Sequence, residues 1–255
     1  MPTCISPAWR TAPSVRILRK SAARPCAGYL LALSLAGAAH AAPAVSPARD
    51  AAQAGMLDVA TLAPGFVVDM RYATPDNFTR RTVPGYEAPR CLLLEPAAEA
   101  LARVQRTLQV QGYALRLYDC YRPVRAVQAF VAWARAPDDR AAKAVHYPGV
   151  DKRDLFARGY IAETSGHSRG ATVDLGLLDC RQGPCRDVDM GTGFDFFDPL
   201  ANTDSPRATP AQHRHRRQLL EAMRAEGFAN YPMEWWHFTY RPEPAPDTAY
   251  DFPIR

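Results

Sequence analysis

The sequence predicts a single α+β domain. About 214 residues follow an N-terminal targeting segment, a length typical of one domain with a sizeable core. Helical and strand-like segments occur without the regular βαβ rhythm of a parallel sheet, and no internal repeat is apparent. We therefore divide the chain into a signal peptide at 1–41, a flexible leader rich in Ala and Pro at 42–55, and a folded domain at 56–255.

The N-terminal segment has the three parts of a secretory signal. Residues 10–24 carry five basic side chains and no acidic one, the run Gly28 to Ala39 is apolar, and the small-residue series Ala39-His-Ala-Ala42 follows. The apolar run is shorter than the roughly 20 residues that span a bilayer. A buried N-terminal helix is the alternative. We expect export to the periplasm, with no stable membrane span after cleavage.

The charge of the chain depends on this segment. It contains five of the 31 Lys and Arg residues and none of the 26 Asp and Glu residues, so the remainder has 26 of each sign. The sequence pI near 9.0 is therefore a property of the targeting segment. The folded domain lacks the excess of basic residues typical of nucleic-acid-binding proteins, and we expect no nucleic acid as a partner.

Four cysteines remain after cleavage, and an even number in an exported protein favours disulfides. Cys180 and Cys185 enclose Arg-Gln-Gly-Pro, a turn-forming stretch, so their pairing is the first prediction. Cys91 with Cys120 is the second, although the sequence does not show that they approach each other. A Cys4 zinc site is disfavoured because closely spaced Cys-x-x-Cys units are missing.

The first half of the domain contains two predicted helices and a strand. Glu95 to Gln111 has apolar residues at helical spacing and ends before Gly112. Ala114 to Tyr121 is typical of a strand. Pro123 then begins a second helix, because proline is favoured at the first helical position. Its apolar face consists of Val124, Val127, Phe130 and Val131.

The second half alternates in the same irregular way. Thr172 to Leu177 predicts a short strand, and residues 179–208, dense in Gly, Pro and Asp, predict a loop. Thr209-Pro-Ala-Gln212 has the form of a capping box and begins a helix that ends near Gly227. Glu234 to Tyr240 is aromatic and strand-like.

Two segments contain residues suited to metal chemistry: Ser165-Gly-His167-Ser-Arg-Gly-Ala-Thr-Val-Asp174 and Glu234-Trp-Trp-His237. Together they offer two imidazoles and two carboxylates. A catalytic zinc site uses three protein ligands and leaves a fourth position to water. The remaining carboxylate can then accept a proton from that water. These segments are therefore candidates for a catalytic metal centre.

The spacing requires turns. His167 and Asp174 are seven residues apart and would face opposite sides of one strand, so a turn near Gly170 must bring them together. Glu234 and His237 are three residues apart and would also face opposite sides of an ideal strand. A bend after Pro232 or a single helical turn would solve it, and the sequence leaves both open.

Each motif alone is weak, because a lone histidine is more often structural than a ligand. His213 and His215 lie among arginines on a predicted helix surface and receive no role. Asp174 alone could be an ordinary strand-end residue. Arg122, in Tyr118-Asp-Cys-Tyr-Arg-Pro123, lies where a strand ends and a helix begins. It could reach a developing oxyanion or be a solvated surface arginine.

In combination, these motifs resemble the D-alanyl-D-alanine dipeptidases of the vancomycin-resistance type, within the zinc D-Ala-D-Ala and L,D peptidases. The shared residues run through nearly all of the domain: Arg71-Tyr-Ala-Thr-Pro-Asp-Asn-Phe-Thr79, Gly85-Tyr-Glu87, Asp119-Cys-Tyr-Arg-Pro123, Ser165-Gly-His-Ser-Arg-Gly170, Val173-Asp174, Met190-Gly191, Phe194-Asp-Phe196, Glu234-Trp-Trp-His237 and Asp251-Phe-Pro253.

The resemblance implies a small, mainly antiparallel sheet with flanking helices and one zinc ion per chain. It implies that the zinc ligands are His167, Asp174 and His237. It further implies that Glu234 is the catalytic base and that Arg122 stabilises the tetrahedral intermediate. The positions that match the family's contacts to the dipeptide are Ser165, Tyr72 and Asp195.

The predicted function is therefore that of an exported zinc metallopeptidase that hydrolyses free D-Ala-D-Ala to two D-alanines, in wall-precursor turnover or peptide scavenging. A D,D-carboxypeptidase or endopeptidase acting on longer wall peptides is one alternative. A non-catalytic wall-peptide-binding protein is another, and the presence of Glu234 argues against it. Two departures from the family are the export signal, since familiar members are cytoplasmic, and Cys120, where a glycine is usual.

Overall fold

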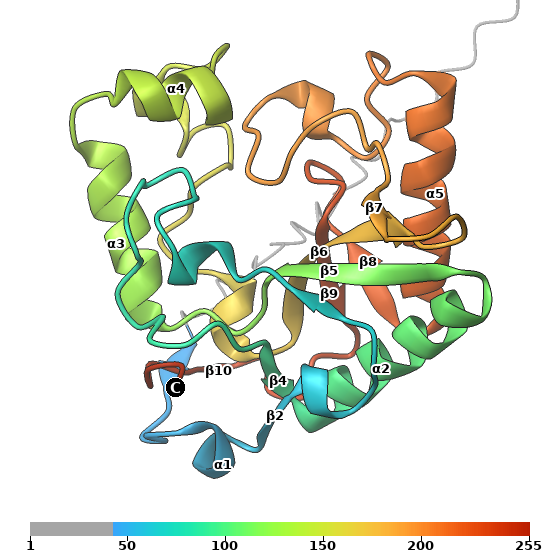
Figure 1. Cartoon of the computed structure of the whole chain (residues 1–255). Helices are drawn as coiled ribbons and strands as arrows, with labels where there is room; N and C mark the ends of the chain where they lie inside the picture. The colour runs from blue at the N-terminus through green and yellow to red at the C-terminus, as the bar shows by residue number, and fades with distance from the viewer. Residues whose placement is uncertain (1–42) are drawn as a thin grey trace, which may run out of the picture. The chain divides into compact units, whose positions relative to one another are not determined.

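The structure is a computed structural model, and it describes residues 43–255 (Figure 1). The predicted signal peptide at 1–41 lies outside the described residues. Within the described part of the chain, no helix is both long enough and apolar enough to cross a membrane.

A six-stranded sheet forms the centre of the domain, in the order β3-β5-β6-β9-β8, with β7 paired to β6. Strand β3 runs parallel to β5, and the other pairs are antiparallel. The prediction of an α+β domain with a mainly antiparallel sheet is confirmed. The strands are β3 (Val67–Val68), β5 (Tyr113–Asp119), β6 (Thr172–Asp179), β7 (Arg186–Asp187), β8 (Phe228–Asn230) and β9 (His237–Tyr240).

Four smaller strands lie outside this sheet. β2 (Met56–Asp58) pairs antiparallel with β4 (Leu92–Leu94), and β1 (Ala44–Val45) pairs parallel with β10 (Thr248–Ala249). The described part of the predicted flexible leader (42–55), residues 43–55, contains regular structure. Its backbone pairs with β10, and Asp50 caps a short helix, α1 (Ala51–Ala54). Composition alone misses this because the pairing partner lies about 200 residues away.

The helices form two groups that build two apolar cores (Figure 1). One group packs with the central sheet around the first core, and it comprises α2 (Glu95–Val110) and α5 (Pro210–Ala225). The other packs with the segment around Tyr72 in a second core, and it comprises α3 (Val124–Arg135) and α4 (Arg140–His146). Strand β6 is buried almost throughout, and this includes Asp174.

The main predicted elements are confirmed to within a few residues. The Thr209 side chain accepts from the Gln212 N–H, and the Gln212 side chain accepts in return, as the capping box predicted. The strand expected from Glu234 begins only at His237, because Glu234 to Trp236 form a turn. The region expected to be a loop also contains β7, and neither α4 nor β8 was predicted.

Both predicted cysteine pairs are joined in the structure. Cys180–Cys185 closes the exposed turn between β6 and β7. Cys91–Cys120 is buried and links the start of β4 to the residue that follows β5. Their sequence separations are 5 and 29 residues, so the second pair brings together segments that are distant along the chain.

Candidate metal centre and active site

The site forms where β6 and β9 meet a one-turn 3-10 helix, η4 (Gly166–Arg169). Ser165 caps this helix by accepting a hydrogen bond from the His167 N–H, and Gly170 ends it with a left-handed backbone, φ +70°. This is the turn that the spacing of the motif required. The chain then enters β6, in which Asp174 lies directly opposite His237, the first residue of β9.

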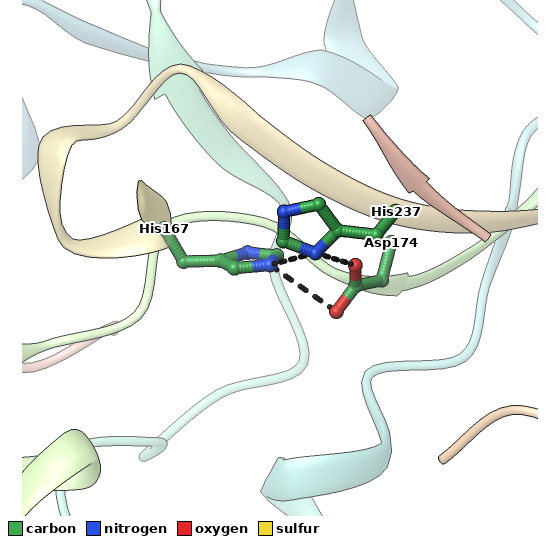
Figure 2. A group of neighbouring side chains, drawn as sticks. All are labelled: His167, Asp174 and His237. Carbon is green, nitrogen blue, oxygen red and sulfur yellow. Dashed lines mark hydrogen bonds and ion pairs between the residues drawn. The ribbon is translucent and has the colours of Figure 1, made fainter. Parts of the chain in front are cut away.

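Three side chains from these elements face one another (Figure 2). His167 Nε2 is 3.2 Å from Asp174 Oδ2, and His237 Nδ1 is 2.9 Å from Asp174 Oδ1. The two imidazole nitrogens are 3.3 Å apart. One nitrogen or oxygen atom from each residue thus points at a common centre, in the combination that the sequence motifs suggested.

The backbone determines which nitrogen of His167 faces this centre. His167 Nδ1 lies 2.7 Å from the Cys120 carbonyl, which can only accept a hydrogen bond. Nδ1 therefore carries the proton, and the lone pair of Nε2 is available to bind a metal ion. His237 uses the opposite nitrogen, Nδ1. The sequence could not distinguish these two modes.

The three groups fit a divalent metal ion. His167 and Asp174 are almost fully buried, and His237 is partly exposed. Burial by itself would raise the pKa of Asp174, but the imidazoles of His167 and His237 outweigh it and hold the pKa below its usual value. A buried carboxylate that stays ionised between two imidazoles is a donor set suited to a catalytic metal with an open position.

Glu234 lies beside this group without joining it. The turn that precedes β9 places Glu234 Oε2 3.6 Å from His237 Nδ1. Burial raises the pKa of Glu234 to about 7, and the neighbouring His237 opposes this shift. Of the two geometries that the sequence left open, the structure has the bend before the strand. A carboxyl group thus lies next to the three residues whose donor atoms converge, without being one of them.

Arg122 reaches the same centre and is held there by a residue to which the sequence analysis assigned no role. Asp119 is fully buried and accepts from Arg122 Nε at 2.9 Å and from Nη2 at 2.8 Å. The same guanidinium Nη2 is 3.5 Å from Asp174 Oδ2. An irregularity in β5 sets Asp119 opposite Asp174, so Arg122 separates two carboxylates that would otherwise repel.

Asp119 has further contacts that support this positioning role. Tyr86 donates to Asp119 Oδ1 at 2.5 Å, and Asp119 Oδ2 lies 3.4 Å from His167 Nδ1. The available signal in the sequence was an aspartate at a strand end, three residues before Arg122. That signal is weak because aspartate is common where strands end.

Tyr72 and Asp195 both line the cavity and are hydrogen-bonded to each other. The Tyr72 hydroxyl donates to Asp195 Oδ2 at 2.9 Å, and both residues are buried. Asp195 adopts a left-handed backbone, φ +56°, unusual for a non-glycine residue. Burial and the nearby charge of Asp174 raise the pKa of Asp195 well above its usual value. A cation entering the cavity would favour the ionised form of this carboxyl.

The loop that carries Asp195 is held by an arginine that sequence analysis missed. Arg216, on α5, is buried, and its guanidinium donates to the carbonyls of Met190, Leu200 and Asn202. Both ends of the loop are thereby held against α5. In the sequence, Arg216 is one of several basic residues on a helix that otherwise carries a solvated face, so no pattern distinguished it.

All eight predicted site residues line one cavity of about 220 Å³. They are Tyr72, Arg122, Ser165, His167, Asp174, Asp195, Glu234 and His237. Phe78 and Phe130 form part of its apolar wall. The volume is below the roughly 300–1,000 Å³ of pockets for drug-sized ligands, so the cavity suits a small substrate.

This arrangement can support hydrolysis. It has three potential metal ligands, a carboxylate that can accept a proton, and an arginine that can stabilise negative charge on oxygen. The same cavity is lined by the buried carboxyl of Asp195, which can pair with a substrate cation. Ser165 Oγ, which also lines this cavity, lies 3.5 Å from Arg122 Nη1.

Comparisons with known proteins agree with these features. A family model described as D-ala-D-ala dipeptidase matches residues 52–255. A D-alanyl-D-alanine dipeptidase of Streptomyces coelicolor is 45% identical over 196 residues, which cover 76% of this chain and 95% of that protein. Another, of Enterococcus faecium, is 39% identical over 187 residues, 73% of this chain and 92% of the relative.

Among solved structures, a variant of a vancomycin-resistance D,D-pentapeptidase in complex with Zn(II) aligns with 59% of this chain and 73% of its own. The TM-score is 0.36 and the sequence identity is 18%, which is too weak a likeness to transfer any feature of the site.

Proposed function

The chain belongs to the D-ala-D-ala dipeptidase family, and we propose that it is a zinc metallopeptidase that hydrolyses free D-Ala-D-Ala to two D-alanines with Glu234 as general base. The observation that carries this proposal is the convergence of His167, Asp174 and His237 beside Glu234 in one small cavity. Relatives named D-alanyl-D-alanine dipeptidase support the choice of substrate.

In the proposed mechanism, the metal ligands are His167 Nε2, Asp174 and His237 Nδ1. When bound, zinc supplies a Lewis acid that polarises the scissile carbonyl and makes water easier to deprotonate near neutral pH. Glu234 accepts the proton of the attacking water and passes it to the leaving amine. Arg122, oriented by Asp119, stabilises the negative charge that develops on the carbonyl oxygen.

A hydrolysis assay tests the proposal directly. Purified protein is incubated with D-Ala-D-Ala, with and without a chelator, and released D-alanine is measured. We expect release that the chelator abolishes and added zinc restores. Release of a single terminal D-Ala from a wall pentapeptide, without cleavage of the dipeptide, would favour the carboxypeptidase alternative. Binding without any cleavage would favour the non-catalytic alternative.

The ligand assignment predicts that His167→Ala and His237→Ala lose bound metal. Each removes one of three donors, so metal analysis of the purified variants should find much less than the one zinc per chain expected of the unsubstituted protein. His213→Ala, on the surface of α5, is the matched control and should keep its zinc. Full zinc occupancy in both ligand variants would reject the assignment.

Arg122 is predicted to act mainly in the transition state. Arg122→Ala should lower kcat by about a hundredfold or more while changing KM much less, because charge on the carbonyl oxygen develops only during attack. Arg122→Lys should restore little, since Asp119 binds two nitrogens of the planar guanidinium. Steady-state kinetics on D-Ala-D-Ala measure both constants, and an effect confined to KM would make Arg122 a clamp for the substrate carboxylate.

We further propose that the chain is exported to the periplasm and that residues 1–41 are removed. The basic head, short apolar run and small-residue site of the sequence support this. The two cysteine pairs also fit an oxidising compartment. Mass spectrometry of the protein recovered from the periplasm should find an N-terminus at Ala42, whereas an intact Met1 in an intracellular fraction would contradict export.

A further inference from the structure

We propose that the Cys91–Cys120 disulfide is a positioning element of the metal centre, because it holds the Cys120 carbonyl against the metal ligand His167. The inference rests on the proposed function only in taking His167 as a ligand. The disulfide acts on the alignment of that ligand, and through it on catalysis.

The orientation of His167 is determined by its hydrogen bond to the Cys120 carbonyl. The Cys120 carbonyl accepts from His167 Nδ1 at 2.7 Å, and this bond directs Nε2 towards Asp174 and His237. A backbone carbonyl in this position cannot rotate independently of its chain. The orientation of the imidazole therefore depends on where the backbone of Cys120 is held.

The strand pairing of β5 with β6 ends before Cys120. The register of β5 against β6 shifts between Leu117 and Asp119, and Asp119 is the last residue paired. Cys120 follows the end of the strand and lies beyond the ladder. The chain thus leaves the sheet at the residue whose carbonyl orients His167, so contacts from outside the sheet hold it there.

The disulfide is the covalent restraint on Cys120, and it comes from the segment around β4. Cys91 is held by the Val59 N–H, which donates to its carbonyl at 2.9 Å. The next residue, Leu92, accepts from the Tyr121 N–H at 2.9 Å. The Leu94 N–H donates to the Gly170 carbonyl at 2.8 Å, on the turn that follows His167. One short strand therefore holds both sides of the contact.

Arg122 shares this restraint. Its N–H donates to the His167 carbonyl at 3.3 Å, two residues after Cys120. Both cysteines are almost fully buried, Cys91 at 0% and Cys120 at 1% exposure, so the bond lies inside the core next to the site. Cys180–Cys185, by contrast, closes an exposed turn at the far end of β6 from Asp174. The exposed Cys180–Cys185 disulfide can therefore serve as a control for removal of the buried one.

The experiment compares two variants with the unsubstituted protein. Cys91→Ala with Cys120→Ala removes the buried disulfide, and Cys180→Ser with Cys185→Ser removes the exposed one. Each metal-free protein is titrated with Zn²⁺ against a chromophoric chelator. The visible absorption of the Co²⁺-loaded protein is then recorded, because it reports the geometry of the ligands. Thermal unfolding of each metal-free protein measures the purely structural effect of losing a cross-link.

We expect the buried-pair variant to bind Zn²⁺ about tenfold more weakly or worse, as when a ligand loses its outer hydrogen-bond partner. Its Co²⁺ spectrum should change as well. The exposed-pair variant should match the unsubstituted protein in both readouts, even where its unfolding temperature falls. Cys91→Val with Cys120→Ala restores the apolar volume without the bond and should behave like the alanine pair.

Three outcomes would overturn the proposal. Equal zinc affinity and equal Co²⁺ spectra in all folded variants would show that the disulfide does not position His167. Full recovery with the Val–Ala pair would assign its effect to packing. Failure of both buried-pair variants to fold would assign the disulfide to the fold. An unsubstituted protein that bound no zinc would instead refute the metal centre of the proposed function.

Discussion

Glu234→Ala is expected to retain zinc and to lose about two to four orders of magnitude in turnover of D-Ala-D-Ala. Glu234 Oε2 is 3.6 Å from His237 Nδ1, and Glu234 lies outside the group of three residues whose donor atoms converge. Removing it should therefore leave the metal ligands in place. It should also remove the carboxylate that accepts the proton of the attacking water.

The measurement pairs metal analysis with kcat on the same preparation. Glu234→Gln preserves the shape of the side chain and should lose nearly as much activity, because an amide cannot act as the base. Glu221→Gln, exposed on α5, is the matched control and should be unaffected. Turnover close to that of the unsubstituted enzyme in Glu234→Ala would require a different base.

N-acetyl-D-Ala-D-Ala is expected to be a far poorer substrate than D-Ala-D-Ala. A dipeptidase must recognise a free ammonium near the scissile bond, and Asp195 offers a buried carboxyl for it, hydrogen-bonded to Tyr72. Acetylation removes that charge. Lost pairing of a buried charge costs on the order of 2–5 kcal/mol, or roughly 30-fold to several thousand-fold in kcat/KM.

Asp195→Asn should erase much of this preference while leaving zinc bound. The amide keeps the size of the side chain and removes the negative charge, so kcat/KM for the free dipeptide should fall towards that for the blocked one. Asp204→Asn, on the exposed surface, is the control and should keep the preference. Equal hydrolysis of the blocked and free peptides by the unsubstituted enzyme would reject the dipeptidase assignment in favour of a carboxypeptidase.

Much of this protein follows from local sequence patterns. The capping box at Thr209 and the apolar spacing of Glu95 to Gln111 predicted helices that the structure contains. The turn at Gly170 was required by the spacing of His167 and Asp174, and it is present. These features are local because a few neighbouring side chains and backbone dihedrals determine them.

The family resemblance supplied the residues that lie far apart in the sequence. Tyr72 and Asp195 are 123 positions apart, and no periodicity links them. No periodicity links β1 and β10 either, and neither the motifs nor the resemblance predicted their pairing. That pairing gives structure to the segment expected to be a flexible leader. Composition carries no information about such partners, because the contacts form only when distant segments meet.

Three features were decided by the tertiary structure alone. Asp119 orients Arg122 because an irregular strand places it opposite Asp174, and Arg216 holds the Asp195 loop because α5 packs against that loop. The third is the choice of nitrogen on His167, which depends on the carbonyl of Cys120. Each role depends on a partner from elsewhere in the chain. An aspartate, an arginine or a histidine has the same local sequence whether its partner is water or a buried group, so only the folded chain distinguishes them.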